Sequence, residues 1–247
     1  MRIPYRCSRL VLVAVLALAL SGCFRHSTVV RVRRDGSGTV ERTLLVNRDV
    51  LGRLKLTAEE LVSLTDTPGF HVSFDFFDRE GLARRGAGMG EGVTFLGGEP
   101  VSTPEGQGFR ATYGFRDISR ITVPLAGGSA GPSLRFSMQQ GEQSTLLVRQ
   151  DPPFASVRPV APGEPDAPAG ASFTLPAGMK FSVAVEVEGE VLASDARYRE
   201  SGRISLVEID SDRLLAAPPA EPLRLLLGAP LPGVLVDLSP EIRVVFR

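Results

Sequence analysis

Apolar and polar residues alternate along most of the chain, which is the pattern of half-buried β-strands. Val30 and Val32 alternate with arginines before a DGSG stretch at residues 35–38, and the alternation resumes from Val40 to Val46. Asp-Gly between two alternating runs is typical of a β-hairpin, because glycine adopts positive φ without a Cβ clash. A phosphate-binding loop would instead require a helix directly afterwards. We therefore predict a hairpin and interpret DGSG as its turn.

The next segment has the start and stop signals of a helix. A turn opened by Asn47 is expected first, and a capped helix follows from Leu56, in which Thr57 and Glu60 can form a capping box. Thr67-Pro68-Gly69 ends it. Residues 79–91 are rich in Gly and Arg and show no period, so we predict a mobile loop there.

Large aromatic side chains recur on alternating positions of the predicted strands at residues 70–77, 109–115 and 181–187. They either fill the core beneath the helix or, if the sheet curves around a partly inserted helix, line an apolar pocket. Both interpretations stay open. The residues of such a pocket would be Phe70, Phe74, Phe76, Phe109, Tyr113, Phe115 and Phe181.

The other expected elements follow from turn signals and periodicity. They are strands around 93–101, a helical turn at 117–120, a hairpin at 134–148, a three-stranded antiparallel meander at 181–187, 191–199 and 204–209, a short helix capped at 210–212, and strands at 234–238 and 241–247. Antiparallel sheets packed against one or two short helices make an α+β fold.

The amino-terminal segment has the organisation of a secretory signal peptide. Arg2, Arg6 and Arg9 precede an apolar run at residues 10–20, and small residues follow. A bilayer-spanning helix needs about 20 apolar residues, so this run is too short to remain as an anchor.

A Pro-rich segment divides the rest. We predict a signal peptide at 1–22, a lipidated tether at 23–28, an α+β domain at 29–150, a disordered Pro-rich linker or long loop at 151–172, and a β-meander with a short helix and a final strand at 173–247, packing on the first part.

Leu20-Ser21-Gly22-Cys23 resembles the lipobox of bacterial lipoproteins. The resemblance implies that the signal is cut before Cys23, that Cys23 receives a diacylglyceryl thioether, and that the new amino terminus is acylated, for example by palmitate. Phe24 stands where an Asp often retains lipoproteins in the inner membrane. In a Gram-negative cell this implies the periplasmic face of the outer membrane.

The lipobox, the DGSG hairpin and the capped helix together resemble the opening of a group of bacterial lipoproteins that includes the mycobacterial LppM-like proteins. Residues 179–189 and 201–210 resemble uncharacterised lipoproteins of Gram-negative bacteria. LppM-like proteins are thought to have an α+β domain that contacts envelope lipids. Neither resemblance implies catalytic residues.

Charge and residue types restrict the chemistry. Removal of residues 1–22 leaves a small net negative charge, which gives no reason to expect nucleic acid. His26 lies in the predicted tether and His71 on a polar strand face, so we expect no metal site, cofactor or catalytic group. Arg84 and Arg85 could meet a lipid headgroup or simply be solvated.

The sequence thus predicts a membrane-anchored lipoprotein of the cell envelope that is not an enzyme and that binds an envelope lipid or an envelope protein. Its attachment is the lipidated Cys23. The alternative is a carrier of lipid or another apolar ligand with a cavity between sheet and helix. A hydrolase is a third hypothesis, and it would require Ser or acidic groups to converge near His71.

Overall fold

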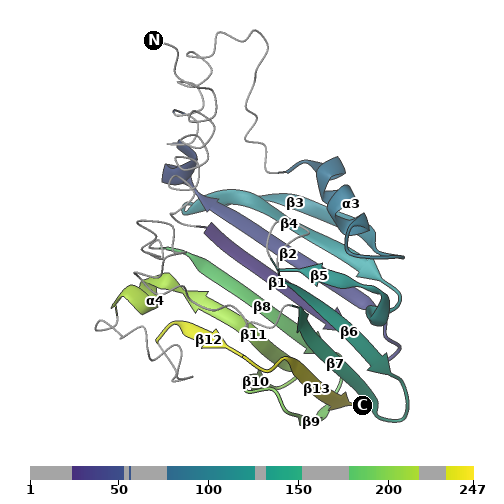
Figure 1. Cartoon of the computed structure of the whole chain (residues 1–247). Helices are drawn as coiled ribbons and strands as arrows, with labels where there is room; N and C mark the ends of the chain where they lie inside the picture. The colour runs from purple at the N-terminus through teal and green to yellow at the C-terminus, as the bar shows by residue number, and fades with distance from the viewer. Residues whose placement is uncertain (1–23, 53–55, 57–76, 126–131, 152–177, 217–231) are drawn as a thin grey trace, which may run out of the picture.

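A computed structural model describes residues 24–52, 56, 77–125, 132–151, 178–216 and 232–247 (Figure 1). The strands are β1 (Phe24–Val32), β2 (Gly38–Asn47), β3 (Thr94–Ser102), β4 (Gly106–Phe115), β5 (Thr122–Pro124), β6 (Ser133–Gln139), β7 (Ser144–Asp151), β8 (Lys180–Val187), β9 (Val191–Ser194), β10 (Arg199–Glu200), β11 (Arg203–Asp210), β12 (Val234–Val236) and β13 (Glu241–Phe246). The helices are α3 (Arg79–Ala87), the 3₁₀ helix η1 (Ile118–Arg120) and α4 (Ser211–Ala216).

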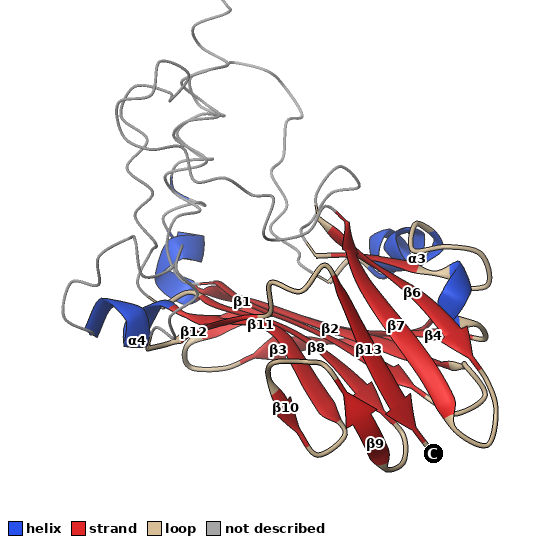
Figure 2. Cartoon of the chain, turned by 60° about the horizontal axis from the view of Figure 1, so that its bottom comes forward, coloured by secondary structure: helices blue, strands red, loops and turns tan. Residues whose placement is uncertain are grey.

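These strands form two sheets. The large sheet has the order β10-β11-β8-β1-β2-β4-β3, with β12 also paired to β11, and the small sheet has the order β5-β6-β7-β13-β9. Strands from both sides of residues 152–177 contribute to each sheet. α3 and α4 lie near opposite edges of the large sheet (Figure 2). The predicted α+β class is confirmed, although β1 and β8 are parallel in otherwise antiparallel surroundings.

The predicted hairpin around DGSG is confirmed. β1 and β2 pair antiparallel from Phe24 opposite Val46 to Val32 opposite Gly38. In the turn, Gly36 adopts φ +79°, and the carboxylate of Asp35 accepts hydrogen bonds from the amide and hydroxyl of Ser37 at 2.9 and 2.7 Å. A side chain that accepts a hydrogen bond from the backbone amide two residues later stabilises a turn whose backbone groups are not paired within the sheet.

The predicted tether at residues 23–28 is wrong from Phe24 onward, because residues 24–28 are the first half of β1. β2 pairs with them on one side and β8 on the other, so their backbone groups are bonded within the sheet. Thr28 is completely buried. Polar residues at 25–28 conceal the strand in the sequence, because alternation is lost where both faces of a strand carry polar side chains.

The predicted three-stranded meander is also wrong in its middle strand. β8 and β11 pair directly with each other, whereas β9 leaves the large sheet and pairs with β13 in the small one. The chain changes sheet near Gly189, which has φ +111° and lies so close to the carbonyl of Arg247 that a Cβ would approach that oxygen to 2.1 Å. Glycine suits both requirements because it has no Cβ.

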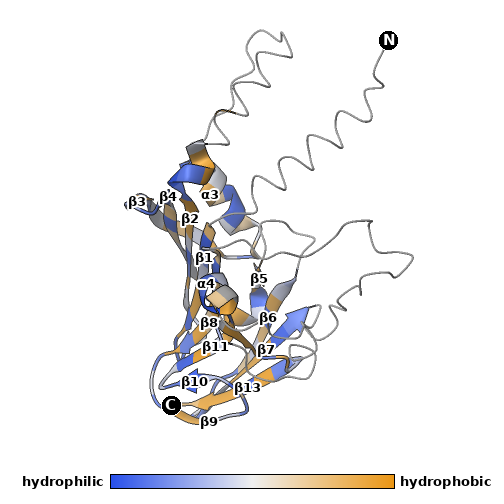
Figure 3. Cartoon of the chain, turned by 90° about the vertical axis from the view of Figure 1, so that its left-hand side faces the viewer, coloured by the Kyte–Doolittle hydropathy of each residue, from blue (hydrophilic) through white to orange (hydrophobic). Residues whose placement is uncertain are grey.

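The hydrophobic core lies between the two sheets, which face one another in the side view of Figure 3 and converge toward β9 and β10. Alternate residues of facing strands point inward, as the period of a strand requires. Buried side chains of the large sheet include Val30, Val32, Val40 and Val185, and those of the small sheet include Leu134, Leu146, Val148, Ile242, Val244 and Phe246.

The predicted mobile loop at residues 79–91 is wrong as well, because Arg79–Ala87 form helix α3. Leu82 and Met89 are buried in the core. Gly86 packs directly on Tyr113 of β4, where an added Cβ would lie 2.7 Å from the ring. Glycine lowers helix propensity, so the sequence favours a loop here, but the close contact with an aromatic ring stabilises the helix in the folded protein.

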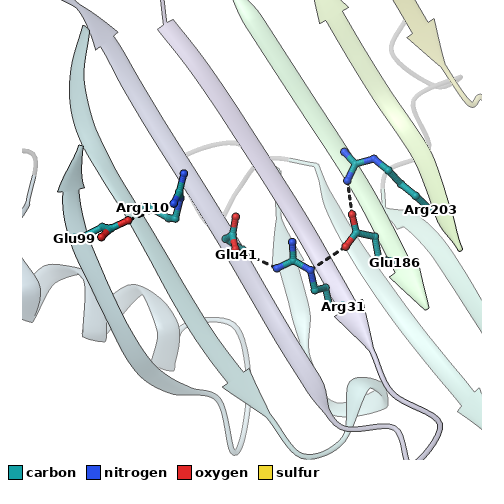
Figure 4. A network of polar contacts seen from close by, with 6 residues as sticks. All are labelled: Arg31, Glu41, Glu99, Arg110, Glu186 and Arg203. Carbon is teal, nitrogen blue, oxygen red and sulfur yellow. Dashed lines mark hydrogen bonds and ion pairs between the residues drawn. The ribbon is translucent and has the colours of Figure 1, made fainter. Parts of the chain in front are cut away.

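The outer face of the large sheet carries opposite charges on successive strands (Figure 4). Arg31 on β1 pairs with Glu41 on β2 at 3.1 Å and with Glu186 on β8 at 2.8 Å, and Glu186 also binds Arg203 on β11. Toward the other edge, Arg110 pairs with Glu99 at 3.3 Å. Exposed ion pairs contribute only about 0.2–1 kcal/mol each, but they keep this face polar and leave the other face to the core.

The other expected elements in the described residues are confirmed. They include the β3–β4 and β6–β7 hairpins, the turn η1, in which Asp117 accepts a hydrogen bond from the amide of Ser119, and α4, in which Asp210 accepts from the amides of Asp212 and Arg213. Asn47 caps the short helical stretch at 48–52 by accepting from the amide of Asp49 at 2.7 Å.

Several expectations concern residues outside the described ranges. They are the capping box at Thr57 and Glu60, the strand with Phe70, Phe74 and Phe76, and most of the Pro-rich linker. Among the described helices, none combines the length and the apolar character that crossing a membrane requires.

We predict that Gly86→Ala lowers the free energy of unfolding by about 1–3 kcal/mol, because the new methyl group overlaps the Tyr113 ring and the packed contact must open. Gly52→Ala is the matched control, since Gly52 is also helical and no described residue places an atom within 4 Å of its Cβ position. The control should be neutral or more stable by up to about 1 kcal/mol. Urea unfolding of both variants measures the difference, and equal effects would contradict the packing assignment.

Candidate functional site

A pocket of about 320 Å³ lies at the end of the large sheet where β1 begins. We call it the β1-end pocket. Its lining includes Arg25 and Ser27 from β1, Thr43 from β2, and Lys180, Phe181 and Ser182 from β8. A neighbouring hollow of about 200 Å³ shares Arg25 and also contacts Glu105. The register places Arg25 next to Lys180, and Ser27 next to Ser182, on adjacent strands.

Polar contacts hold the lining of this pocket in place. Ser182 donates a hydrogen bond to the hydroxyl of Ser27 at 3.0 Å. Lys180 pairs with Asp210 at 3.0 Å, and its hydrogen bond holds the pKa of that carboxyl below the ordinary value. Arg25 pairs with Glu105 at 2.6 Å. The lining therefore combines two cations, each paired with a carboxylate, with several hydroxyl groups, and it also includes Glu208.

A second group of polar side chains lies on the inner face of the same strands. His26 stacks on Phe181 with 5.3 Å between ring centroids and 15° between planes. Burial, with the nearby charge of Arg42, lowers the pKa of His26 to about 4. Arg42 donates to the carbonyl of Pro124 on β5, so it bridges the two sheets. Burial also lowers the pKa of Arg42, and the charge of Arg85 adds to this effect.

The structure distributes the predicted pocket residues over different environments. Phe109, Tyr113 and Phe115 are buried in the core on one face of β4. Phe181 is partly buried against the core on the inner face of β8 and also borders the β1-end pocket. Cys23, Phe70, Phe74 and Phe76 lie outside the described residues.

The sequence prediction missed the polar residues of the inner face. The sequence pattern places His26 in a tether and Arg42 among the ordinary positions of an alternating strand. One signal in the sequence indicates the buried arginine. Arg42 lies between Val40 and Leu44, on the alternating positions of the strand that are otherwise apolar. An arginine in the buried phase of a strand is uncommon because burial of its charge is costly.

Within the described ranges, no three His, Cys, Asp or Glu side chains come together in a way that could hold a metal ion. Arg84 on α3 lies near Asp78 and Glu80, at 3.6 and 3.7 Å, and is exposed.

Fold and pockets together define an α+β protein with two packed sheets. No family model matches the chain. No curated protein matches its sequence. Among solved structures, the NMR structure of the folded domain of the LppM protein from Mycobacterium tuberculosis is similar, with 10% sequence identity over 92% of this chain and 90% of that chain and a TM-score of 0.34. At this TM-score the similarity does not establish a shared fold.

His26 should make stability depend on pH. The unfolded chain takes up the imidazole proton below about pH 6.5, whereas the folded protein takes it up only near pH 4. The free energy of unfolding should therefore fall as pH decreases from about 6.5 to about 4, by up to about 3 kcal/mol from this residue. Urea unfolding across this range measures the fall.

His26→Gln is the informative variant, because it retains a polar side chain without a titration in this range. The difference in stability between the wild-type protein and the variant should change with pH between about 6.5 and 4 and be constant above pH 7. A difference that stays constant over the whole range would show that His26 titrates normally in the folded protein.

Proposed function

We propose that the protein is a lipid-anchored protein of the bacterial cell envelope, attached through Cys23, and that its folded part is a non-enzymatic module that binds an envelope lipid or an envelope protein. The lipobox-like residues Leu20 to Cys23 support the anchor. Where the cell has two membranes, Phe24 after the cysteine favours the periplasmic face of the outer membrane.

The observation that carries the proposal is the start of β1 at Phe24, directly after the cysteine. An extended chain spans at most about 3.6 Å per residue. The Cα atom of Arg25, a residue of the β1-end pocket, is therefore within about 7 Å of the Cα atom of Cys23 along an extended chain. An acyl group on Cys23 would hold this end of the large sheet at the membrane surface.

The lining of the β1-end pocket suits the polar headgroup of a lipid. Arg25 and Lys180 can pair with an anionic headgroup when it takes the place of their carboxylate partners, Glu105 and Asp210. Ser27, Thr43 and Ser182 supply hydroxyl groups that donate and accept hydrogen bonds. The carrier alternative, with a cavity between sheet and helix, gains less support, because Gly86 of α3 packs directly on Tyr113.

Metabolic labelling with a palmitate analogue tests the anchor. In a host that processes bacterial lipoproteins, the wild-type chain should be labelled, and its intact mass should equal residues 23–247 plus the diacylglyceryl group and the amino-terminal acyl group. Cys23→Ser should abolish the label because the thioether cannot form. Cys7→Ser, the matched control, should retain it, since Cys7 lies in the segment that is removed. An unlabelled wild-type chain would refute the lipid anchor.

Reactivity of Lys180 tests the orientation at the membrane. Lys180 should be acetylated by an amine-reactive reagent at least about threefold more slowly in phosphatidylglycerol vesicles than in detergent micelles. The reason is that contact with an anionic surface protects the amine. Arg33→Lys supplies an internal reference just beyond the opposite end of β1. The introduced lysine should react at similar rates in vesicles and in micelles. Equal protection of both amines, or of neither, would contradict the orientation.

A further inference from the structure

Three buried polar atoms on the inner face of the large sheet have no hydrogen-bond partner within the described part of the chain. They are His26 Nδ1, Thr28 Oγ1 and Arg42 Nε. Thr28 has no exposed surface at all. A buried polar group without a partner costs about 1–3 kcal/mol, so three of them at one place point to a ligand that supplies the missing partner.

The pairing of strands places these atoms together. Thr28 of β1 is directly opposite Arg42 of β2, and cross-strand partners on one face have Cβ atoms about 4.5–5.5 Å apart. His26 lies two residues before Thr28 and so shares its face. The hydrogen bond from Arg42 to the carbonyl of Pro124 fixes the guanidinium between the sheets and leaves its Nε–H free.

The charge at this place is positive and uncompensated. On the outer face, Arg31, Arg110 and Arg203 each pair with a glutamate. Arg42 has no such carboxylate partner in the described part of the chain, and Arg85 lies close enough to disfavour its charge further. An unpaired buried cation is strongly destabilising, so the missing partner should carry negative charge.

We propose that Arg42, Thr28 and His26 bind an oxyanion, a carboxylate or phosphate group, on the inner face of the large sheet. The Nε–H of Arg42 and the hydroxyl of Thr28 donate hydrogen bonds to it. His26 donates from Nδ1 in the neutral tautomer that carries its proton there. This site does not depend on the lipid anchor.

The surroundings of the site are apolar. Leu44 and Phe181 are the cross-strand neighbours of His26, and Phe109 pairs with Leu44 from β4. A weakly hydrated setting strengthens a charge-assisted hydrogen bond. It also suits the chain of an amphiphile, so the oxyanion belongs either to a free anion or to the head of an amphiphilic molecule.

Binding is measured by NMR on the full lipidated protein in a non-ionic detergent, with the imidazoles of the two histidines labelled with ¹⁵N and His71→Gln used for assignment. The probes are inorganic phosphate, acetate, decanoate and decyl phosphate. Saturable shifts of the His26 imidazole are expected. Saturation by phosphate or acetate identifies a free anion, and saturation by the decyl probes alone identifies an amphiphile.

Arg42→Gln should weaken binding of the effective probe by about tenfold or more, because a charge-assisted hydrogen bond is lost. Thr28→Val should weaken it by about threefold to tenfold. Thr39→Val is the matched control, since Thr39 lies on the same strand as Arg42 but on its outer face, opposite Arg31, and the affinity of this variant should be unchanged. Absence of any saturable shift, or wild-type affinity of Arg42→Gln, would overturn the site.

Urea unfolding of Thr28→Val distinguishes a ligand site from a trapped water molecule. Without a probe, the variant should be as stable as the wild-type protein or more stable, because a methyl group replaces an unpaired hydroxyl. With a saturating probe, the wild-type protein should gain more stability than the variant. An equal loss of stability with and without the probe would indicate a structural water and overturn the proposal.

Discussion

The structure depends on the double pairing of β1 with β2 and β8. β1 lies in the interior of the large sheet, antiparallel to β2 and parallel to β8. The β2 partner is close in sequence, whereas β8 follows about 150 residues later. A long-range pairing of this kind closes a large loop, whose entropic cost grows only slowly with length. It joins both parts of the chain into the same sheet and fixes where the amino-terminal end of the sheet lies.

The two faces of β1 and β2 serve different purposes because side chains alternate across a strand. Outward residues such as Arg31 and Glu41 form ion pairs that keep the open face of the sheet polar. Inward residues are apolar where the small sheet covers them, as at Val30 and Val40. Nearer the start of β1, the inner face becomes polar at Thr28 and Arg42. Costly polar burial at one end of an otherwise apolar face is typical of a functional position.

The same end of the sheet is where an anchor on Cys23 would act. No spacer separates the cysteine from β1, so a lipid at that residue and the β1-end pocket would lie within a few residues of each other. The pocket and the inner polar group share His26 but face opposite sides of the sheet. Membrane contact and oxyanion binding are therefore separable, and loss of one would not remove the other.

Local signals in the sequence were sufficient for the elements that depend on neighbouring residues. The DGSG turn, the caps at Asp117 and Asp210, and the hairpins of β3 with β4 and of β6 with β7 follow from turn chemistry and from the period of two, which act over a few residues. The fold class follows from the same patterns. The aromatic face of β4 was also identified correctly as inward-facing, although the sequence left open what it contacts.

Only the tertiary structure decided the partners. Residues 24–28 are a strand because β8 pairs with them from far along the chain, and β9 changes sheets because β13 offers a free edge. Gly86 stands in a helix because Tyr113 requires a close approach. The inner site was hidden for the same reason, since Arg42 meets Thr28 only through strand register. Sequence determines which side chains share a face, whereas long-range packing determines what that face meets.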